Sequence, residues 1–159
     1  MLRRVNLGWL KGSLAVSFGG EPYLLLLGTR GLALTRFRRN FAKRLAYTLG
    51  SRAIIRLYEA RKAVKLSKLD LADLREELGK LMREGSIELV GFLLSNWVAK
   101  VELKRDWLGR VKIYIHKTNG EKVSLKLIFG LGSGIDRDEA ISLAKRLFKE
   151  ANLKLKEEL

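Results

Sequence analysis

Several residue types that support common chemistries are absent or scarce in this chain of 159 residues. It has no cysteine, no glutamine, one histidine, one proline and two methionines. The absence of cysteine excludes a disulfide framework, thiolate metal sites and cysteine nucleophiles, and a single histidine excludes zinc sites held by paired histidines. This scarcity, beside abundant lysine, arginine and leucine, is typical of thermophilic proteins.

Long apolar runs are absent as well. The longest are 23–27 and 87–94, and the second is broken by Glu88, whereas a helix that spans a bilayer needs about 20 apolar residues. The basic residues within 1–4 precede a stretch too short and too mixed for a signal sequence. We therefore expect a cytoplasmic protein, and its length fits a single domain over 1–159.

The chain is rich in positive charge. Lysine and arginine number 32 against 17 acidic residues, which gives a net charge of +15, while 47% of the residues are hydrophobic. That apolar fraction excludes a disordered polycationic tail. The excess lies in 30–68, with twelve bases and one acid, and in 100–126, with eight bases and three acids. Charge of one sign gathered in this way indicates the class of partner rather than the fold.

The hydrophobic pattern predicts an α+β fold with a helical insert between the third and fourth strands. The insert covers about 41–84, where apolar residues recur at helical spacing, Gly50 interrupts the pattern and Asp70 can cap a second helix. A C-terminal helix is expected at about 136–151, and residues 152–159 are expected to extend or fray from it. The seven predicted strands lie near 13–18, 23–28, 31–37, 87–94, 97–105, 110–117 and 121–129.

The last three strands carry their apolar residues at odd positions. Residues that face one another across a hairpin point to the same side of the sheet, so each connecting loop needs an odd number of residues. Loops at 107–109 and 118–120 meet this condition, with Gly120 in a left-handed bulge position. The odd-numbered residues are Ala99, Val101, Leu103, Val111, Ile113, Ile115, Val123, Leu125 and Leu127.

The order of these elements resembles prokaryotic pleckstrin-homology-like (PH/GRAM-type) domains. The resemblance rests on the hairpin 23–37 followed by a helical insert, on the strand at 92–104, which ends in VAKVELK, and on the hairpin 113–122. Leu94 stands where those domains have a proline. The resemblance implies a seven-stranded antiparallel barrel or bent sandwich, closed at one end by the C-terminal helix. It also implies ligand binding rather than catalysis.

No set of residues converges in a way that predicts catalysis. The acids at 70–77 and 136–139 fit the first turns of helices, where they complement the helix dipole. The loop 130–134 precedes a helix, but no Lys-Ser/Thr follows it, so we interpret it as a connector rather than a phosphate loop. His116 is interpreted as a surface residue, with phosphate or base contact as the alternative. We expect a non-enzymatic protein with no cofactor, no metal and no small-molecule substrate.

The strongest functional signal is the basic part of the helical insert. Like charges at i, i+4 spacing, as in Arg52 and Arg56, cost about 0.2–0.5 kcal/mol per pair, so their accumulation favours a nucleic acid or ribonucleoprotein partner. A solvated face, or pairing with the acidic segment 70–88, is the alternative. The candidate contacts are Arg36, Arg38, Arg39, Lys43, Arg44, Arg52, Arg56, Arg61, Lys62 and Lys65.

A second basic surface is predicted on the even-numbered face of the later strands. Basic groups around an aromatic ring are typical of nucleic-acid platforms. The candidates are Lys100, Lys104, Lys112, Tyr114, Lys122 and Lys126.

Two other classes of function stay open. One is a module for protein or peptide interaction or for oligomerisation, because PH-like barrels commonly bind peptides. The other is attachment to an anionic membrane surface through Trp107 and Leu108, which lie at a hairpin tip beside several bases. For Trp107 itself we expect the ring to fold back over the edge of the barrel, with an exposed anchor on a protein, a base or a membrane as the alternative.

Overall fold

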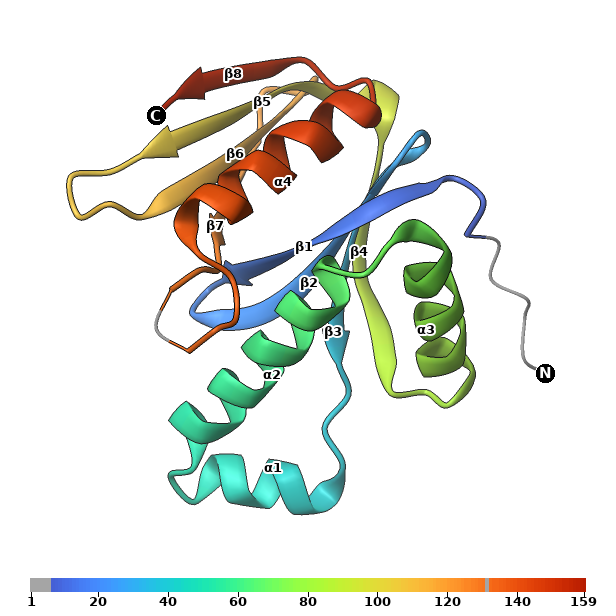
Figure 1. The fold of residues 1–159 in the computed structure, drawn as a ribbon, viewed down its shortest axis with the longest axis vertical. Coiled ribbons are helices and arrows are strands. Elements are labelled where there is room, and N and C mark those ends of the chain that lie inside the picture. The colour runs from blue at the N-terminus through green and yellow to red at the C-terminus, as the bar shows by residue number, and fades with distance from the viewer. Residues whose placement is uncertain (1–6, 131) are drawn as a thin grey trace.

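The computed structural model describes residues 7–130 and 132–159, which form an α+β fold around one eight-stranded sheet (Figure 1). Four α-helices and one 3₁₀ turn, Ser95–Trp97, accompany the sheet in this part of the chain. The helices are α1 (Phe41–Thr48), α2 (Arg52–Ser67), α3 (Leu71–Arg83) and α4 (Arg137–Glu150). The strands are β1 (Leu10–Phe18), β2 (Glu21–Gly28), β3 (Gly31–Phe37), β4 (Ile87–Leu94), β5 (Val98–Arg105), β6 (Val111–Lys117), β7 (Lys122–Leu127) and β8 (Leu155–Glu158).

The sheet is open, with the strand order β4-β3-β2-β1-β7-β6-β5-β8. All neighbours are antiparallel except β5 and β8, which run parallel. The prediction of seven strands, with 152–159 fraying from the helix, is therefore wrong. The chain leaves α4 through Asn152, which has a φ of 59°, and then pairs along β5. This strand was missed because three of its four residues are charged, so no apolar alternation marks it.

The two later hairpins turn as the odd-even pattern predicts. The backbone N–H of Asp106 donates to the carbonyl oxygen of Arg110 at 2.9 Å, and the backbone N–H of Lys117 donates to the carbonyl oxygen of Glu121 at 2.8 Å. Each loop therefore has three residues, and Gly120 has a φ of 91°.

One inward-facing residue was predicted wrongly. A β-bulge between Val98 and Lys100 shifts the register of β5 against β6, so Ala99 is exposed. Val101 and Leu103, beyond the bulge, are fully buried as predicted. A bulge places two residues opposite one, and the apolar pattern carries no mark of it here.

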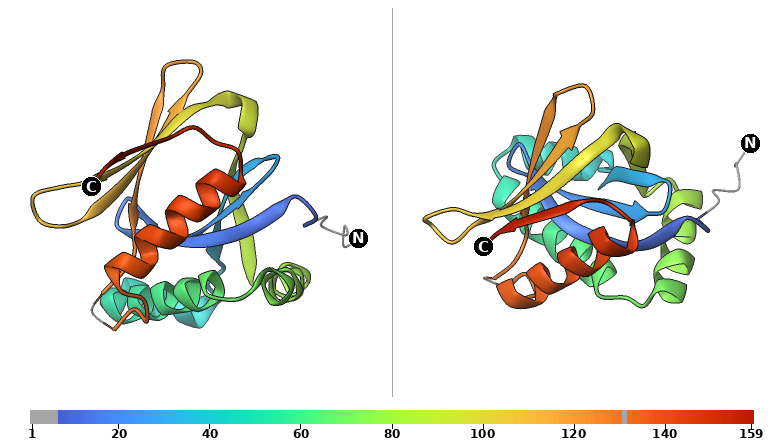
Figure 2. Two further views of the ribbon diagram at one scale, coloured as in Figure 1. Left: turned by 45° about the horizontal axis from the view of Figure 1, so that its top comes forward. Right: turned by 90° about the horizontal axis from the view of Figure 1, so that it is seen from above.

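The centre of the sheet is covered on both sides. The four leucines at 24–27 are at most 2% exposed, which fits a strand that is buried on both faces. Both α2 and α4 pack against β1 and β2, and Leu147 of α4 lies so close to Gly12 that a Cβ there would meet it at 2.4 Å. The helices of the insert, α1 to α3, gather along one side of the molecule (Figure 2).

Local capping explains where the helices begin and end. Asp70 accepts from the backbone N–H of Asp73 at 2.9 Å, and Asp136 accepts from that of Glu139 at 2.8 Å. The insert is three helices, and Gly50, with a φ of 109°, separates α1 from α2 as predicted.

The apolar stripe of α3 belongs to the core. Leu74, Leu78 and Leu81 are at most 5% exposed, so this stripe does not present a face to a partner helix. None of the helices in the described residues is long and apolar enough to cross a membrane.

Candidate functional site

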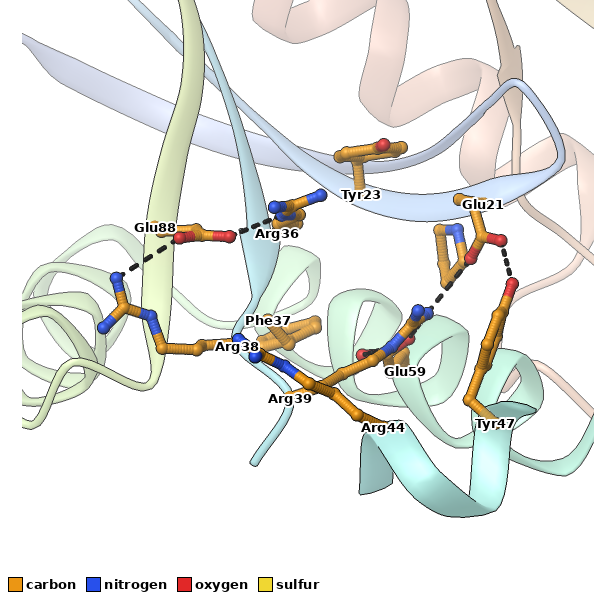
Figure 3. Close-up of a pocket in the computed structure, with 11 residues that line it drawn as sticks. Glu21, Tyr23, Arg36, Phe37, Arg38, Arg39, Arg44, Tyr47, Glu59 and Glu88 are labelled. Carbon is orange, nitrogen blue, oxygen red and sulfur yellow. Dashed lines mark hydrogen bonds and ion pairs between the residues drawn. The ribbon is translucent and has the colours of Figure 1, made fainter. Parts of the chain in front are cut away.

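Arginines that the sequence offers as polyanion contacts gather with glutamates in one pocket (Figure 3). The pocket has a volume of about 410 Å³. It lies where β2, β3 and β4 meet the helical insert, and we call it the arginine pocket. Its charged lining is Arg36, Arg38, Arg39, Arg44, Glu21, Glu59 and Glu88.

Two of these arginines share one carboxylate on the neighbouring strand. Arg36 lies directly opposite Glu88 in the pairing of β3 with β4, and its Nε donates to Glu88 Oε1 at 2.5 Å. Arg38 Nη2 donates to Glu88 Oε2 at 3.3 Å. The hydrogen bond from Arg36 lowers the pKa of Glu88 more than partial burial raises it, so the pKa lies below its ordinary value. Both arginines are more than half exposed, so solvent screens each pair and it contributes little to stability.

Arg39 makes the most buried contact of the pocket. Its Nη2 lies 2.6 Å from Glu59 Oε1 and 3.0 Å from Glu21 Oε2, and its Nε donates to the second Glu59 oxygen at 3.3 Å. Glu59 is 4% exposed and is the single acid among residues 30–68. The hydrogen bond to Glu59 is the largest cause that raises the pKa of Arg39. The charge of Arg39 is therefore neutralised inside the protein.

Glu21 joins this pair to helix α1. The Tyr47 hydroxyl donates to Glu21 Oε1, and Arg56 Nη2 donates to the same oxygen at 3.3 Å and to the Tyr47 hydroxyl at 3.1 Å. Burial raises the pKa of Glu21, but hydrogen bonds from Tyr47 and Arg39 outweigh it, so the pKa lies below its ordinary value. These contacts hold α1 and α2 against the end of β2.

The low pKa of Glu21 predicts that acid destabilises the fold. Below the ordinary value of 4.5, an unfolded glutamate binds a proton that folded Glu21 does not, so unfolding is favoured as pH falls. This contribution to stability is complete above 4.5 and is lost as the pH drops through the lower folded pKa. We expect Tyr47→Phe, which removes one hydrogen bond to Glu21, to flatten this acid-dependent loss.

Urea unfolding between about pH 7 and pH 3 measures the effect. Parallel pH profiles for Tyr47→Phe and the unsubstituted chain would show that the hydroxyl does not set the pKa of Glu21.

Among residues 7–130 and 132–159, the predicted alternative of pairing with the segment 70–88 holds only for Glu88. The other two acids of the arginine pocket, Glu21 and Glu59, lie outside that segment. An isolated acid in a basic helix, such as Glu59, indicates a buried ion pair. Nothing in the sequence indicates that Glu21 contacts the same arginine. Four of the predicted contacts, Arg36, Arg38, Arg39 and Arg56, are thus held in internal ion pairs.

Bases of α2 and acids of α3 line a separate groove of about 780 Å³. In the described residues no ion pair joins the two helices, so the acids of α3 lie near these bases without contacting them. The charged lining is Arg61, Lys62, Lys65, Asp73, Glu76 and Glu77.

The glycine loop before α4 packs against α2. Arg61 Nε donates to the Gly132 carbonyl at 2.6 Å, and Lys68 Nζ donates to the Gly134 carbonyl at 2.9 Å. The loop therefore presents carbonyl oxygens to basic groups, which fits a connector that supports the insert. Leu131, within it, lies outside the described residues.

Other bases of the insert lie over aromatic groups. Lys43 Nζ is 5.0 Å from the ring centroid of Tyr58, and Lys62 Nζ is 4.9 Å from that of Phe37. Arg52 donates to the Tyr47 carbonyl at 3.3 Å.

Two further bases of the insert are less engaged. Arg44 and Lys65 make no ion pair within the described part of the chain. Of the predicted contacts in the insert, these two keep their side-chain charge most freely available.

The predicted sheet face aligns three lysines in a row across β5, β6 and β7. Lys104 lies opposite Lys112, and Lys112 lies opposite Lys126. We call these three residues the lysine row. Tyr114 follows Lys112 on the same face of β6, with Lys122 Nζ 4.6 Å from its ring centroid.

Ion pairs neutralise only one edge of this face. Lys104 lies 3.6 Å from Glu158 of β8, and Lys100 lies 3.3 Å from Glu102, whose carboxylate also lies 2.8 Å from His116 Nε2. His116 Nε2 therefore faces a carboxylate without the geometry of a hydrogen bond, and a phosphate at this nitrogen would meet the charge of Glu102.

The other lysines of the face are unpaired. Lys112, Lys122 and Lys126 take part in no ion pair among the described residues. Together with Tyr114, they form the sheet-face site.

The hairpin tip between β5 and β6 is exposed. Trp107 is 90% exposed and Leu108 is 55% exposed, so the expectation that the indole folds back over the sheet edge is wrong. Asp106 holds the turn by accepting from the backbone of Leu108 and from the backbone and side chain of Arg110.

The described residues contain no group of three or more histidine, cysteine or acidic side chains arranged to hold a metal. Comparisons with protein-family models, curated proteins and solved structures found no significant match.

Proposed function

We propose that this protein is a cytoplasmic, non-enzymatic binding module with PH-like architecture, and that it binds nucleic acid through the sheet-face site. The PH-like part of the proposal is supported by the strand order, in which β1 joins the group β2–β4 to the group β5–β7. It is also supported by the C-terminal helix α4, which packs against β1 and β2. In this proposal β8 is an addition to the edge of the sheet.

The main support for nucleic acid as the ligand is the lysine row. Like charges directly opposite one another on neighbouring strands are destabilising, and here three lysines occupy successive strands. Glu158 already faces Lys104, and phosphate groups laid across β6 and β7 would neutralise Lys112 and Lys126. The half-buried ring of Tyr114, beside the row, is the group proposed to stack with a base, in place of the Lys122 ammonium that lies over it.

The helical insert contributes less to this proposed site than its composition predicts. Arg36, Arg38, Arg39 and Arg56 already contact carboxylates, so binding a polyanion there would require breaking those pairs. A protein ligand for the sheet face is the alternative, because lysines around a half-buried ring also fit an acidic peptide.

Binding of duplex DNA and of structured RNA at different salt concentrations tests the proposal. With about three phosphates contacted, one for each lysine of the sheet-face site, affinity is expected to fall about fortyfold between 50 and 200 mM salt. Fluorescence anisotropy with labelled oligonucleotides measures it. We expect Lys112→Glu/Lys126→Glu to weaken binding by at least about tenfold.

The matched control reverses two charges on the insert, Lys62→Glu/Lys65→Glu, and is expected to change the affinity less. If the insert variant loses more affinity than the sheet variant, the sheet-face site is not the main contact. Oligonucleotide affinity that does not change with salt concentration would reject nucleic acid as the ligand. So would binding of an acidic peptide to the sheet face that excess nucleic acid does not compete away.

A further inference from the structure

Helix α1 has its polar side toward the protein and its apolar side toward solvent. Phe41, Leu45 and Leu49 follow one another at intervals of four, so they share one stripe of the helix and its C-cap. Their exposed fractions are 81%, 49% and 77%, and no residue of α1 is buried. Tyr47 lies on the other side of the helix, where its hydroxyl donates a hydrogen bond to Glu21 and accepts one from Arg56.

The first half of α2 is arranged in the same way. Ile54, Leu57 and Tyr58 lie at i, i+3 and i+4, and they are 73%, 41% and 55% exposed. The side of α2 that turns inward carries the charged residue Glu59, which is 4% exposed and bound to Arg39. In an ordinary surface helix the apolar stripe would face the core.

The charge around these two stripes has one sign. Between Asn40 and Tyr58 the chain has four basic residues and no acidic one, and one of the four, Arg56, is already paired with Glu21. Lys43 and Arg44 lie on α1, and Arg52 begins α2. Figure 1 shows α1 at one end of the long axis of the molecule, where a broad surface can approach it. We call residues 41–58 the apolar hairpin.

We infer that the apolar hairpin docks on a lipid bilayer that contains anionic headgroups. Phenylalanine and leucine on one side with lysine and arginine around them is the composition of helices that lie in the membrane interface. The apolar side chains would enter the boundary between headgroups and acyl chains, while the bases contact lipid phosphates or carboxylates. This surface is distinct from the sheet-face site and from the tip at Trp107.

The charge pattern disfavours a second copy of the chain as the occupant. A symmetric dimer would bring the same patch of both copies together, and would place the bases of one apolar hairpin against those of the other. A bilayer needs no complementary groove, and the hairpin lies at a protruding end of the molecule (Figure 1). A protein with an acidic and apolar surface is the competing occupant, and the test below separates it.

Flotation of the full chain with vesicles tests the inference. We expect binding to vesicles of phosphatidylcholine with phosphatidylserine, and at least about fivefold weaker binding to phosphatidylcholine alone. The variant Phe41→Ser/Leu45→Ser/Leu49→Ser is expected to lower the partition coefficient by about tenfold or more. Because these side chains are exposed, its urea unfolding curve is expected to stay close to that of the unsubstituted chain.

The matched control is Trp107→Ser, which removes the most exposed apolar side chain elsewhere. Equal loss of vesicle binding in Trp107→Ser and the hairpin variant would overturn the inference, as would no binding to anionic vesicles. A dimer in light scattering that the hairpin variant dissociates would assign the surface to a second copy. Binding of an acidic amphipathic peptide that the hairpin variant loses, while the unsubstituted chain does not bind anionic vesicles, would assign the surface to a protein.

The two proposals can fail separately. Loss of vesicle binding in the hairpin variant with unchanged oligonucleotide binding supports docking through this surface alone. Vesicle binding that depends on Lys112 and Lys126, and not on the apolar hairpin, would overturn the inference.

Discussion

Replacing Arg39 with methionine is expected to lower the free energy of unfolding by about 3 kcal/mol. The substitution keeps most of the volume of the side chain but leaves the Glu59 carboxylate, which is 4% exposed, without its bidentate partner. An ionised carboxylate that cannot reach water or a cation is costly to bury, whereas the unfolded chain hydrates it. Urea denaturation followed by circular dichroism measures the difference.

Two further variants separate burial from charge. Arg36→Met breaks an exposed pair with Glu88 and is expected to cost less than about 1 kcal/mol. The double variant Arg39→Met/Glu59→Met removes both charges. It is expected to recover much of the unfolding free energy lost in Arg39→Met, because no carboxylate is left buried without a partner. If Arg36→Met and Arg39→Met cost the same, the arginine pocket is a solvated surface network and burial of Glu59 does not matter.

Truncating Phe148 to alanine is expected to cost about 3–5 kcal/mol. The ring is fully buried on α4, and the next residue along the helix toward the N-terminus, Leu147, lies against Gly12 of β1. Losing the ring removes buried apolar area and leaves a cavity that packed neighbours fill only in part. This loss is a large fraction of the total stability of an ordinary domain, so a marked fall in the unfolding midpoint is expected.

Leu108→Ala is the comparison for this prediction. Its side chain is 55% exposed at the tip of a hairpin, and its loss is expected to change stability by less than about 0.5 kcal/mol. A cost below about 1 kcal/mol for Phe148→Ala would mean that α4 does not seal the core.

Features set by neighbours in the chain could be predicted from the sequence. Asp70 and Asp136 cap helices because their side chains reach backbone N–H groups three residues ahead. The three-residue loop ending at Gly120 follows from the two-residue period of strands. Each of these depends on contacts within a few residues, so a local pattern is enough to specify it.

Features that depend on distant contacts were missed. The last strand, β8, exists because β5 offers it an edge to pair with, and its own residues show no strand pattern. The bulge that exposes Ala99 is likewise a property of the pairing of β5 with β6.

The sequence by itself determined the chemistry that is excluded and the sign of the charge. Without cysteine and with one histidine, several kinds of site cannot form, and a net charge of +15 holds for any fold of the chain. The tertiary structure decided which charges are available, because Glu21, Glu59 and Glu88 arrive from separate elements to neutralise arginines. It also decided that the apolar stripe of α1 faces outward, since Tyr47 is held on the inner side by residues distant in sequence.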